Sequence, residues 1–550
     1  MEKYFIESPA PTPNGRLHLG HIAGPYLASD IFNRVQRSNG NMTFFCCDLD
    51  RNQSYVRCAS LENGIEREEF IRKNADNIKN TFSDYEIEFD LFNLYDSEER
   101  RQFIINFIKP LFFSEYSEKR TVEFYYDIKK EKFLVEAFIS GVCPKCKENV
   151  KGGFCEICGY YNFSIDLEKP FSTLNPEMEL VKKSCEINVL NIQKIADKIK
   201  NIIHDSNMDE SIKKTVIDLM NKNTVFPITL PLEDGLSLDS DRTKLSPWIE
   251  VLCGIYYMKS IARLFLNCHQ YEDMQHVCFS GIDNSFYFTV ICNAIRIALG
   301  YKDFPKSYYF NHYYTLDEKK FSTSRNHAVW ADNVSERFSM DKLRLFLAST
   351  YPQLKKFDFS YLSLMQFEKS LDRKGWINKL RVLLPCFLLN SSKTLENRNP
   401  NFYADTLCNF LRDENNKPEI NLNLLLQALC PSLYNKLNRE MGISPQITRS
   451  SPNLFRNIQG VNARKIIHID EANFTLSIAS VKNGEKTVPH QHYELDELFY
   501  IFEGKGLITL DNREACLESG DSVFIPGGVI HTIKPVDCHG LKFLSIAWRK

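Results

Sequence analysis

Three histidines and one glutamate near the C-terminus restrict the fold of this chain more than any other feature of its sequence. They are His490, His492, Glu497 and His531, and they lie on short strand-like runs that glycine turns separate from Phe455 onward. Such runs are typical of an all-β module. Imidazole nitrogens together with one carboxylate can bind Zn, Fe, Ni or Cu. The pattern therefore predicts a small β-barrel that holds a divalent metal.

The N-terminus predicts a second, different chemistry. Residues 4–6 are a short apolar run, a proline- and glycine-rich turn follows at 9–15, and the spacing of apolar residues from His18 to Val35 is helical. Strand, turn and helix open a parallel α/β unit, in which ligands bind at the carboxyl ends of the strands. His18 and His21 stand at the start of the predicted helix, where backbone N–H groups favour anions such as phosphates.

Later segments continue this α/β pattern. Strands are predicted at Thr43–Cys47, Val277–Ser280 and Tyr308–Tyr314, and helices at Leu380–Leu389 and Leu422–Leu429 within a helical stretch at 361–445. The run Lys320–Arg325 follows the last of these strands and predicts a mobile cationic loop. Charge that develops on a transferring phosphoryl group needs such donors.

Two Cys-x-x-Cys pairs mark an insertion in the α/β unit. They are Cys143 with Cys146 and Cys155 with Cys158, and Cys155 lies nine positions after Cys146, with two glycines between them. Four thiolates at this spacing form the compact tetrahedral cage of a structural zinc site. The alternative is four unrelated buried thiols, which the repeated pair and the intervening glycines disfavour.

Length and composition exclude some classes of protein. A chain of 550 residues is too long for one core, and roughly three or four domains are expected. The formal net charge of −2 argues against a large nucleic-acid footprint, which needs clustered Lys and Arg. The first residues lack the apolar run of a signal peptide, and no stretch reaches ~18 apolar residues. We therefore expect a cytoplasmic protein without a membrane segment, in which most of the 17 cysteines are free thiols.

Residues 1–360 resemble a class I aminoacyl-tRNA synthetase, and most closely its methionyl branch. His18-Leu-Gly-His21 is similar to the HIGH motif of that family, and Lys320-Phe-Ser-Thr-Ser324 is similar to its KMSKS motif. The two cysteine pairs resemble its zinc-bearing connective insert. Ser246-Pro-Trp248-Ile-Glu250 and Gly281-Ile-Asp283 resemble the Val-Trp-Leu-Asp and Gly-Lys-Asp segments of the branch.

The resemblance implies a role for individual residues. The implied catalytic residues are His18, His21, Lys320, Ser322 and Arg325. The implied contacts of ATP and its Mg ion are His18, Gly20, His21, Gly281, Asp283 and Lys320, with Asp283 on the ribose. The implied contacts of the amino acid are Pro9, Ala10, Thr12, Asp50, Trp248 and Phe288. Among these, Asp50 would hold the substrate ammonium group and Trp248 would form one wall of the pocket.

Several positions depart from the methionyl branch. Thr323 replaces the second lysine of KMSKS, Thr12 replaces a pocket tyrosine, Phe288 replaces a pocket histidine, and Arg51 with Asn52 replaces an acidic residue and a histidine. These changes disfavour methionine as the substrate. Arg51 either pairs with an acidic side chain of another substrate or is a solvated surface residue, and the second interpretation is the more common one for an arginine.

The C-terminal pattern resembles the cupin signature over residues 455–550. Both halves of the signature are present, except that Thr532-Ile-Lys-Pro535 follows His531 where the signature ends in asparagine. The resemblance implies that the three histidines and the glutamate named above are metal ligands. Zn would act as a Lewis acid without redox chemistry, whereas Fe(II) would indicate O2 chemistry, and the ligands do not decide between them. A metal-free structural barrel is the alternative.

Together these segments predict a multidomain fold. It has an α/β Rossmann-like class I synthetase domain with a zinc-knuckle insert, a short α-helical domain and a C-terminal all-β cupin barrel. The expected domains are the first half of the catalytic domain at 1–110, the connective insert at 111–185, the second half with the KMSKS-like loop at 186–360, a truncated helical domain at 361–445 and the cupin at 446–550. The helical part is short for an anticodon-binding bundle, so tRNA is not expected as a partner.

A methionyl-synthetase-like domain joined to a cupin resembles the hydrazine synthetases of natural-product pathways. The resemblance implies that ATP and an amino acid give an aminoacyl-adenylate, which the hydroxyl of N6-hydroxylysine attacks to give an ester. The α-amine of the aminoacyl group then attacks the ester nitrogen, with a cupin Zn or other divalent metal assisting, so that an N–N bond forms and the weak N–O bond breaks. A lysine N-hydroxylase would act upstream. The identity of the activated amino acid is left open.

Two other functions stay open. One is a methionyl-tRNA synthetase with an appended cupin, and the other is a non-catalytic sensor of an amino acid or a nucleotide. The short helical part and Thr323 disfavour the first. Amino-acid-dependent ATP–pyrophosphate exchange would separate an enzyme from a sensor.

Overall fold

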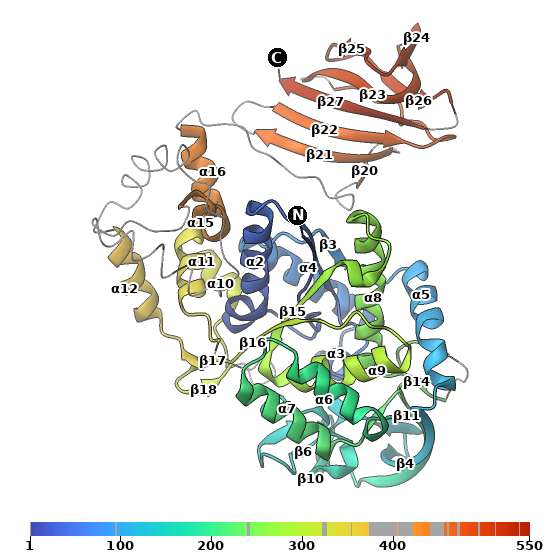
Figure 1. Ribbon diagram of the computed structural model, residues 1–550, viewed down its shortest axis with the longest axis vertical. Helices are drawn as coiled ribbons and strands as arrows, with labels where there is room; N and C mark the ends of the chain where they lie inside the picture. Colours follow the sequence, from blue (N-terminus) through green and yellow to red (C-terminus); the bar gives the residue numbers. More distant parts are fainter. Residues whose placement is uncertain are drawn as a thin grey trace. The chain divides into compact units, whose positions relative to one another are not determined.

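The chain forms two compact units. The computed structural model describes residues 2–93, 96–238, 242–321, 327–353, 355–372, 404, 407, 422–440, 456–458, 461–469, 474–492, 495–511, 513–537 and 540–549. The N-terminal unit spans Met1–Ile443 and the C-terminal unit spans Ser444–Lys550. Figure 1 colours them from blue to red along the sequence. This division separates the two chemistries that the sequence predicts.

A five-stranded parallel sheet forms the centre of the N-terminal unit. Its strands lie in the order β16 (Ser307–Asn311), β15 (Gln275–Gly281), β1 (Lys3–Glu7), β2 (Met42–Asp48) and β3 (Leu91–Asn93). Tyr4 and Ile6 pack into one apolar core and Phe5 packs into another, so both faces of the sheet are covered, as is typical of parallel sheets. The Rossmann-like α/β fold predicted from the sequence is confirmed.

The order of the strands reverses at β1. The next strand along the chain, β2, lies on one side of β1, whereas the later strand β15 lies on its other side. Open α/β sheets bind their ligands at the carboxyl ends of the strands where such a reversal occurs. The fold therefore places a ligand site beyond Glu7, at the segment that begins with Ser8.

The helix after β1 is interrupted. The apolar spacing predicts one helix over 18–35, but the structure has α1 (Leu19–His21), a π-helical segment at Ile22–Tyr26 and α2 (Leu27–Ser38). Gly24 has a non-helical ψ of −114°, and a β-carbon there would lie 2.6 Å from Nδ2 of Asn311 on β16. The helical pattern predicted from His18 to Val35 is therefore found, but it is distorted at Gly24, where the backbone approaches the sheet too closely to carry a side chain.

The other predicted strands are found with small shifts. Thr43–Cys47 lies within β2 and Val277–Ser280 lies within β15. Tyr308–Tyr314 is divided between β16 and the separate strand β17 (Tyr314–Leu316). The division arises because the backbone N–H of His312 leaves the sheet and donates to the carbonyl of Pro352. β17 pairs instead with β18 (Lys319–Lys320) and β19 (Phe357–Asp358).

Small antiparallel sheets form the insert between the two halves of the parallel sheet. One contains β12 (Val225–Pro227), β11 (Val181–Asn191), β4 (Ser117–Asp127) and β5 (Lys132–Leu134) in that order. A second contains β10 (Glu168–Ser172), β6 (Ile139–Val142) and β7 (Asn149–Lys151). β8 (Gly153–Phe154) pairs with β9 (Tyr161–Asn162), and β13 (Thr229–Leu230) pairs with β14 (Lys244–Leu245). The cysteine pairs lie within this insert, as the sequence predicts.

The remaining described helices of the N-terminal unit pack around the sheet. They are α3 (Ser54–Asn63), α4 (Arg67–Asp84), α5 (Glu98–Ile108), α6 (Ala196–His204), α7 (Glu210–Lys222), α8 (Pro247–Phe265), α9 (Cys292–Ala298), α10 (Ala331–Ser335), α11 (Met340–Ser349), α12 (Tyr361–Asp372), α15 (Leu422–Leu429) and α16 (Pro431–Glu440). The helix predicted at Leu422–Leu429 is confirmed, and the one predicted at Leu380–Leu389 lies outside the described residues. No helix in the described ranges combines the length and apolarity that crossing a membrane requires.

The C-terminal unit is all-β, as predicted. Its strands are β20 (Arg456–Ile458), β21 (Val461–Ile469), β22 (Phe474–Val481), β23 (Leu495–Leu510), β24 (Arg513–Glu518), β25 (Ser522–Ile525), β26 (His531–Pro535) and β27 (Leu541–Arg549). The long strand β23 pairs with β24, β25, β26 and β27. Its alternate residues Phe499 and Ile501 are buried with Ile533 and Phe543 in a separate apolar core.

A buried arginine holds several helices of the N-terminal unit together. The guanidinium of Arg344 on α11 is fully buried. It donates to Oδ2 of Asp30 on α2 at 2.7 Å, to the carbonyl of Tyr85 at 2.6 Å and to the carbonyl of Leu429 at 3.2 Å. Buried backbone carbonyls need such partners. Arg344 therefore joins α15 to the helices that cover the sheet.

Replacement of Arg344 should destabilise the N-terminal unit strongly. Arg344→Met removes the donors and leaves Asp30 and several carbonyls short of partners, so the free energy of unfolding should fall by about 3–5 kcal/mol. Denaturant titration that follows the unfolding of this unit measures the change. The control Arg337→Met alters an exposed side chain and should change stability by less than about 0.5 kcal/mol. Equal stability of the two variants would contradict this role of Arg344.

Candidate functional site

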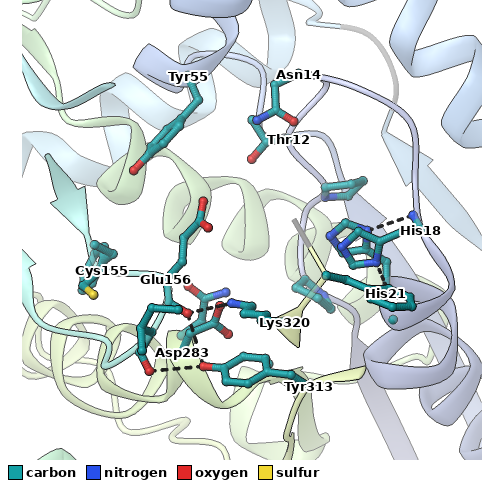
Figure 2. A pocket seen from close by; sticks show the side chains of 18 of the residues that line it. Thr12, Asn14, His18, His21, Tyr55, Cys155, Glu156, Asp283, Tyr313 and Lys320 are labelled. Atoms are coloured by element: carbon teal, nitrogen blue, oxygen red, sulfur yellow. Dashed lines mark hydrogen bonds and ion pairs between the residues drawn. The ribbon is translucent and has the colours of Figure 1, made fainter. Parts of the chain in front are cut away.

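A cavity of 600 Å³ lies at the carboxyl ends of β1 and β15. Ten of the residues that the resemblance assigns to catalysis, ATP or the amino acid line it: Pro9, Ala10, Thr12, His18, Gly20, His21, Trp248, Gly281, Asp283 and Lys320. They come from segments far apart in the chain, and Figure 2 shows several of them around the same space. The cavity lies where the reversal of strand order places a ligand site.

His18 and His21 face each other at one side of the cavity. Their rings stack with centroids 3.6 Å apart and planes 11° apart. The backbone N–H of each residue donates to Nδ1 of the other, at 3.2 Å in both cases (Figure 2). Because both Nδ1 atoms accept hydrogen bonds, the ring proton of each imidazole belongs on Nε2. Both side chains can therefore donate to an anion.

The two histidines are uncharged near neutral pH. Burial, and next the charge of Lys320, lower the pKa of His21 to about 4. Burial and the neighbouring His21 lower the pKa of His18 well below its usual value. Neutral imidazoles donate N–H hydrogen bonds to phosphate oxygens without a change of protonation. The positive charge at this site therefore comes from other groups. Among the described residues, Lys320 is one of them.

Lys320 bridges the parallel-sheet half of the unit and the insert. Its Nζ lies 3.1 Å from Oδ2 of Asp283 and donates to the carbonyl of Glu156 at 2.6 Å (Figure 2). The same ammonium lies 4.0 Å from the centre of the Tyr313 ring. Ser322 and Arg325, which the sequence also singles out, lie outside the described residues.

Only some of the residues predicted to contact the amino acid line the cavity. Trp248 lines the cavity, and its ring packs against Phe154 of the insert at 4.5 Å. Asp50 does not line the cavity, although the hydroxyl of Thr12 donates to its carboxylate at 3.4 Å. Phe288 is buried and does not line the cavity either. Burial raises the pKa of Asp50 well above its usual value, so an ammonium group would have to approach Asp50 for its charge to be stabilised.

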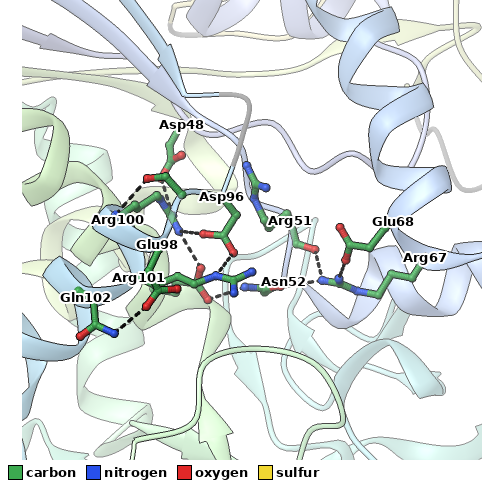
Figure 3. Close-up of polar contacts among 12 residues, drawn as sticks. Asp48, Arg51, Asn52, Arg67, Glu68, Asp96, Glu98, Arg100, Arg101 and Gln102 are labelled. Carbon is green, nitrogen blue, oxygen red and sulfur yellow. Dashed lines mark hydrogen bonds and ion pairs between the residues drawn. The ribbon is translucent and has the colours of Figure 1, made fainter.

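Arg51 is not a solvated surface residue. Only 7% of it is exposed, so the surface interpretation is wrong. Its backbone carbonyl accepts from Arg67 at 2.9 Å, and the adjacent Asn52 donates to Glu250 at 2.8 Å (Figure 3). These contacts fold the segment after Asp50 inward. Burial lowers the pKa of Arg51, and the charges of Asp96 and Asp48 oppose this shift.

A layer of buried ion pairs lies beside this segment. The guanidinium of Arg100 lies 2.8 Å from Asp48, 3.1 Å from Glu250 and 3.4 Å from Asp96. Figure 3 shows Arg51 and Asn52 next to these groups. Arg51 and Asn52, two of the positions that depart from the methionyl branch, therefore lie beside a connected layer of buried ion pairs.

The insert contributes cavity residues that the sequence did not single out. They are Gln53 and Tyr55 beside the insert, and Ser140, Gly141, Asn149, Val150, Lys151, Phe154, Glu156, Ile157 and Phe171 within it. Tyr55 donates to the carbonyl of Gly152 at 3.1 Å, which joins α3 to the insert. Charged residues such as Lys151 and Glu156 carry no pattern in the sequence that separates them from solvated residues. Only the fold brings them to the cavity.

The four cysteines of the knuckle fit a structural zinc site. Their sulfurs all lie within 4.8 Å of one another. Cys143 and Cys158 are 3.9 Å apart, and Cys146 and Cys155 are 3.6 Å apart. A tetrahedral site with Zn–S bonds of ~2.3 Å places its sulfurs roughly 3.8 Å apart. Each pair ends in a matching turn, with φ of 63° at Lys147 and 71° at Gly159. These residues can therefore hold zinc as the sequence predicts.

The three histidines and the glutamate of the C-terminal unit also converge. The ligand atoms of His490, His492, Glu497 and His531 lie within 4.8 Å of one another. Nε2 of His531 and Oε2 of Glu497 are 3.2 Å apart, and both atoms are buried without a hydrogen-bond partner. Two buried orphan atoms directed at one point fit the donor set of a metal ion.

Neighbouring groups orient these ligands. Nδ1 of His490 lies 2.8 Å from the carbonyl of Val488, and Nδ1 of His531 lies 3.1 Å from the carbonyl of Val529. Each Nδ1 must therefore carry the proton, which leaves the lone pair of Nε2 for a metal. Ser545 donates to the second oxygen of Glu497 at 2.5 Å. The donor set suits Zn and other divalent metals.

Known families match both units. The family described as "tRNA synthetases class I (M)" matches residues 4–370, and the family described as "Cupin domain" matches residues 477–546. The methionine–tRNA ligase of Methanococcus aeolicus is 25% identical over 369 residues, which cover 65% of this chain and 55% of that protein. The corresponding ligase of Bacillus cereus strain G9842 is 26% identical, and the match covers 65% of this chain and 68% of that protein. The ligase of Flavobacterium psychrophilum is 29% identical, and the match covers 66% of this chain and 54% of that protein.

The fold agrees with these matches. A solved structure described as Mycobacterium tuberculosis methionyl-tRNA synthetase in complex with methionyl-adenylate superposes with a TM-score of 0.61 at 13% identity. The match covers 81% of this chain and 95% of that one. The chain spans between about half and two thirds of the length of the methionine–tRNA ligases named above.

We expect about two metal ions per chain, one at each donor set. Cys155→Ser/Cys158→Ser should lose one of them and destabilise the insert, because a closed thiolate cage contributes to folding. Elemental analysis of purified protein, with thermal unfolding alongside, measures both effects. Cys516→Ser, which alters an exposed cysteine outside both sets, is the control. A stable double variant with full metal content would exclude the knuckle as a zinc site.

Proposed function

The chain belongs to the class I tRNA synthetase family of the M type, and we propose that it is an ATP-dependent hydrazine synthetase. In this proposal the N-terminal unit joins an amino acid to AMP and releases pyrophosphate. The aminoacyl group then passes to the hydroxyl of N6-hydroxylysine. The cupin unit completes the reaction by converting the resulting ester to an N–N linked product. The observation that carries the proposal is a complete His3Glu donor set in the same chain as an adenylate-forming fold.

The cavity has the groups that adenylate formation needs. The Nε2–H groups of His18 and His21 can donate to phosphate oxygens, and Lys320 can neutralise charge on the departing pyrophosphate. Lys320 is bound to Asp283 in this structure, so ATP that enters must compete for both partners. When Lys320 moves to the phosphates, the carboxylate of Asp283 becomes available to the ribose hydroxyls.

The later steps are balanced without an external oxidant. The acceptor hydroxyl displaces AMP, which gives an ester whose nitrogen is bonded to the ester oxygen. The α-amine of the aminoacyl group attacks that nitrogen through a five-membered arrangement. An N–N bond forms, the N–O bond breaks, the carboxylate leaves and the amine releases a proton. The residues that would hold a divalent ion in the cupin are His490, His492, Glu497 and His531. Such an ion, when bound, supplies a Lewis acid.

Transfer to tRNA is the competing use of the adenylate. The relatives named above are methionine–tRNA ligases, but Thr12 and Phe288 replace the tyrosine and histidine of the methionyl pocket. Thr323 removes one cation of the KMSKS motif. A cupin is also foreign to tRNA charging. A small acceptor supplied by a lysine N-hydroxylase accounts for both units, and charging of purified tRNA with methionine would instead support a tRNA ligase.

Exchange between ATP and pyrophosphate tests the first step. The wild-type protein should catalyse it in the presence of one amino acid, which also separates an enzyme from a sensor. His21→Ala and Lys320→Ala should each slow exchange ~10²-fold or more, because each loses a donor to the transition state. Lys319→Ala alters the neighbouring lysine, which is exposed, and serves as the control. Unchanged exchange in both test variants would remove these residues from the mechanism.

Removal of cupin ligands tests the last step. His490→Ala/His492→Ala should retain adenylate formation and abolish the N–N product, so that the ester or its hydrolysis products accumulate. Mass spectrometry of single-turnover mixtures measures each species. The wild-type reaction should also proceed without O2, because N–O cleavage balances N–N formation. Product formation at the wild-type rate in the double variant, or stoichiometric consumption of O2, would exclude this role of the cupin.

A further inference from the structure

We propose that the insert wall of the cavity binds the acceptor of the activated amino acid, with Glu156 on the α-ammonium group and Lys151 on the α-carboxylate. This inference rests on the proposed function, because it takes the acceptor to be an amino acid with an N-hydroxylated side chain. Such a molecule carries two opposite charges at one end and its reacting hydroxyl at the other. The insert wall carries the matching pair of charges, and the sheet half of the cavity carries the groups assigned to ATP.

Glu156 is an exposed residue at the cavity. Its carboxylate points into the cavity (Figure 2). Its backbone carbonyl accepts from Lys320 at 2.6 Å and from the hydroxyl of Tyr313 at 3.3 Å, and it directly follows the knuckle ligand Cys155. Within the described part of the chain its carboxylate makes no ion pair. A fixed backbone with an uncommitted carboxylate is suited to bind a cation.

Lys151 supplies the opposite charge on the same wall. It is the last residue of β7, where its register partner across the sheet is Ser140, and both residues line the cavity. Its ammonium lies 3.9 Å from the carboxylate of Glu62, and the two side chains are 25% and 43% exposed. An ion pair this long and this exposed is weak. Lys151 can therefore turn to an incoming carboxylate.

The pair of charges favours an amino acid over a nucleic acid. An RNA end would bring phosphates toward the insert, where a negative Glu156 would repel them. A zwitterion gains from both residues at once, and it loses one contact when either of its charged groups is missing. The sheet side already carries His18, His21, Lys320 and Asp283. The acceptor can therefore lie along the insert wall with its hydroxylated end directed at the adenylate.

Matched acceptors and variants test this assignment. The KM of transfer is measured for wild type, Glu156→Gln and Lys151→Gln with three acceptors: N6-hydroxylysine, its analogue without the α-amine and its analogue without the carboxylate. In wild type each analogue should raise KM roughly 10–100-fold, which corresponds to one charge-assisted hydrogen bond. Glu156→Gln should bind N6-hydroxylysine and the analogue without the amine equally poorly. Lys151→Gln should bind N6-hydroxylysine and the analogue without the carboxylate equally poorly.

ATP–pyrophosphate exchange is measured on the same preparations. The loss in transfer should exceed any loss in exchange at least tenfold, because exchange needs no acceptor. Glu148→Gln, which alters an exposed knuckle residue outside the cavity lining, is the control and should match wild type in transfer. If both variants keep the wild-type KM and the wild-type discrimination between acceptors, the acceptor site is overturned and the proposed function stands. If the wild type activates an amino acid but transfers it to no N-hydroxylated amine, both the acceptor site and the proposed function are overturned.

Discussion

The reversal of strand order at β1 decides where the parts of the candidate active site lie. Parallel strands end at one edge of the sheet, and the connections on either side of β1 leave in opposite directions. The segment from Pro9 to His21 follows β1, and Gly281 to Asp283 follows β15. Both therefore reach the same cavity although some 260 positions separate them in the sequence. The interruption at Gly24 is part of this arrangement, because it lets the first helix lie against β16 beside the cavity.

The insert forms one wall of the candidate site. A four-thiolate cage constrains the knuckle locally, and the knuckle then offers the carbonyl of Glu156 to Lys320 and Tyr313. Gly159 lies so close to the sheet half that a β-carbon there would be 2.9 Å from the carbonyl of Asp283. The cysteine knuckle therefore lies against Asp283, which in turn pairs with Lys320.

In the proposed reaction, the two units would divide steps that are linked by an unstable intermediate. An ester with a weak N–O bond is lost to hydrolysis or rearrangement when it diffuses away, and a covalent link between two sites raises the effective concentration of each for the other's product. Hydrogen bonds with neighbouring groups orient the candidate metal ligands of the cupin. The carbonyls of Val488 and Val529 select the tautomers of His490 and His531, and Ser545 holds one oxygen of Glu497.

Sequence patterns predicted which side chains lie together wherever a few neighbouring residues form the cluster. The cysteine pairs, the histidines with Glu497, and His18 with His21 have spacings that imply their own local geometry, and the described residues converge in the structure. The class I synthetase fold and the cupin were likewise predicted from such segments and are confirmed by the family matches. The roles of all these site residues stay predictions, and Ser322 and Arg325 also lie outside the described residues.

Tertiary structure decided what depends on contacts between distant segments. Arg51 is buried because Arg67 and Glu250 draw its loop inward, and no local pattern distinguishes it from a solvated arginine. Phe288 and Asp50 do not line the cavity, whereas Lys151 and Glu156 do. By itself the sequence determined which reactive groups the chain carries, because residue type and spacing are local properties. Which of those groups share one cavity was decided by the strand order and the packing of the insert, because burial depends on the whole fold.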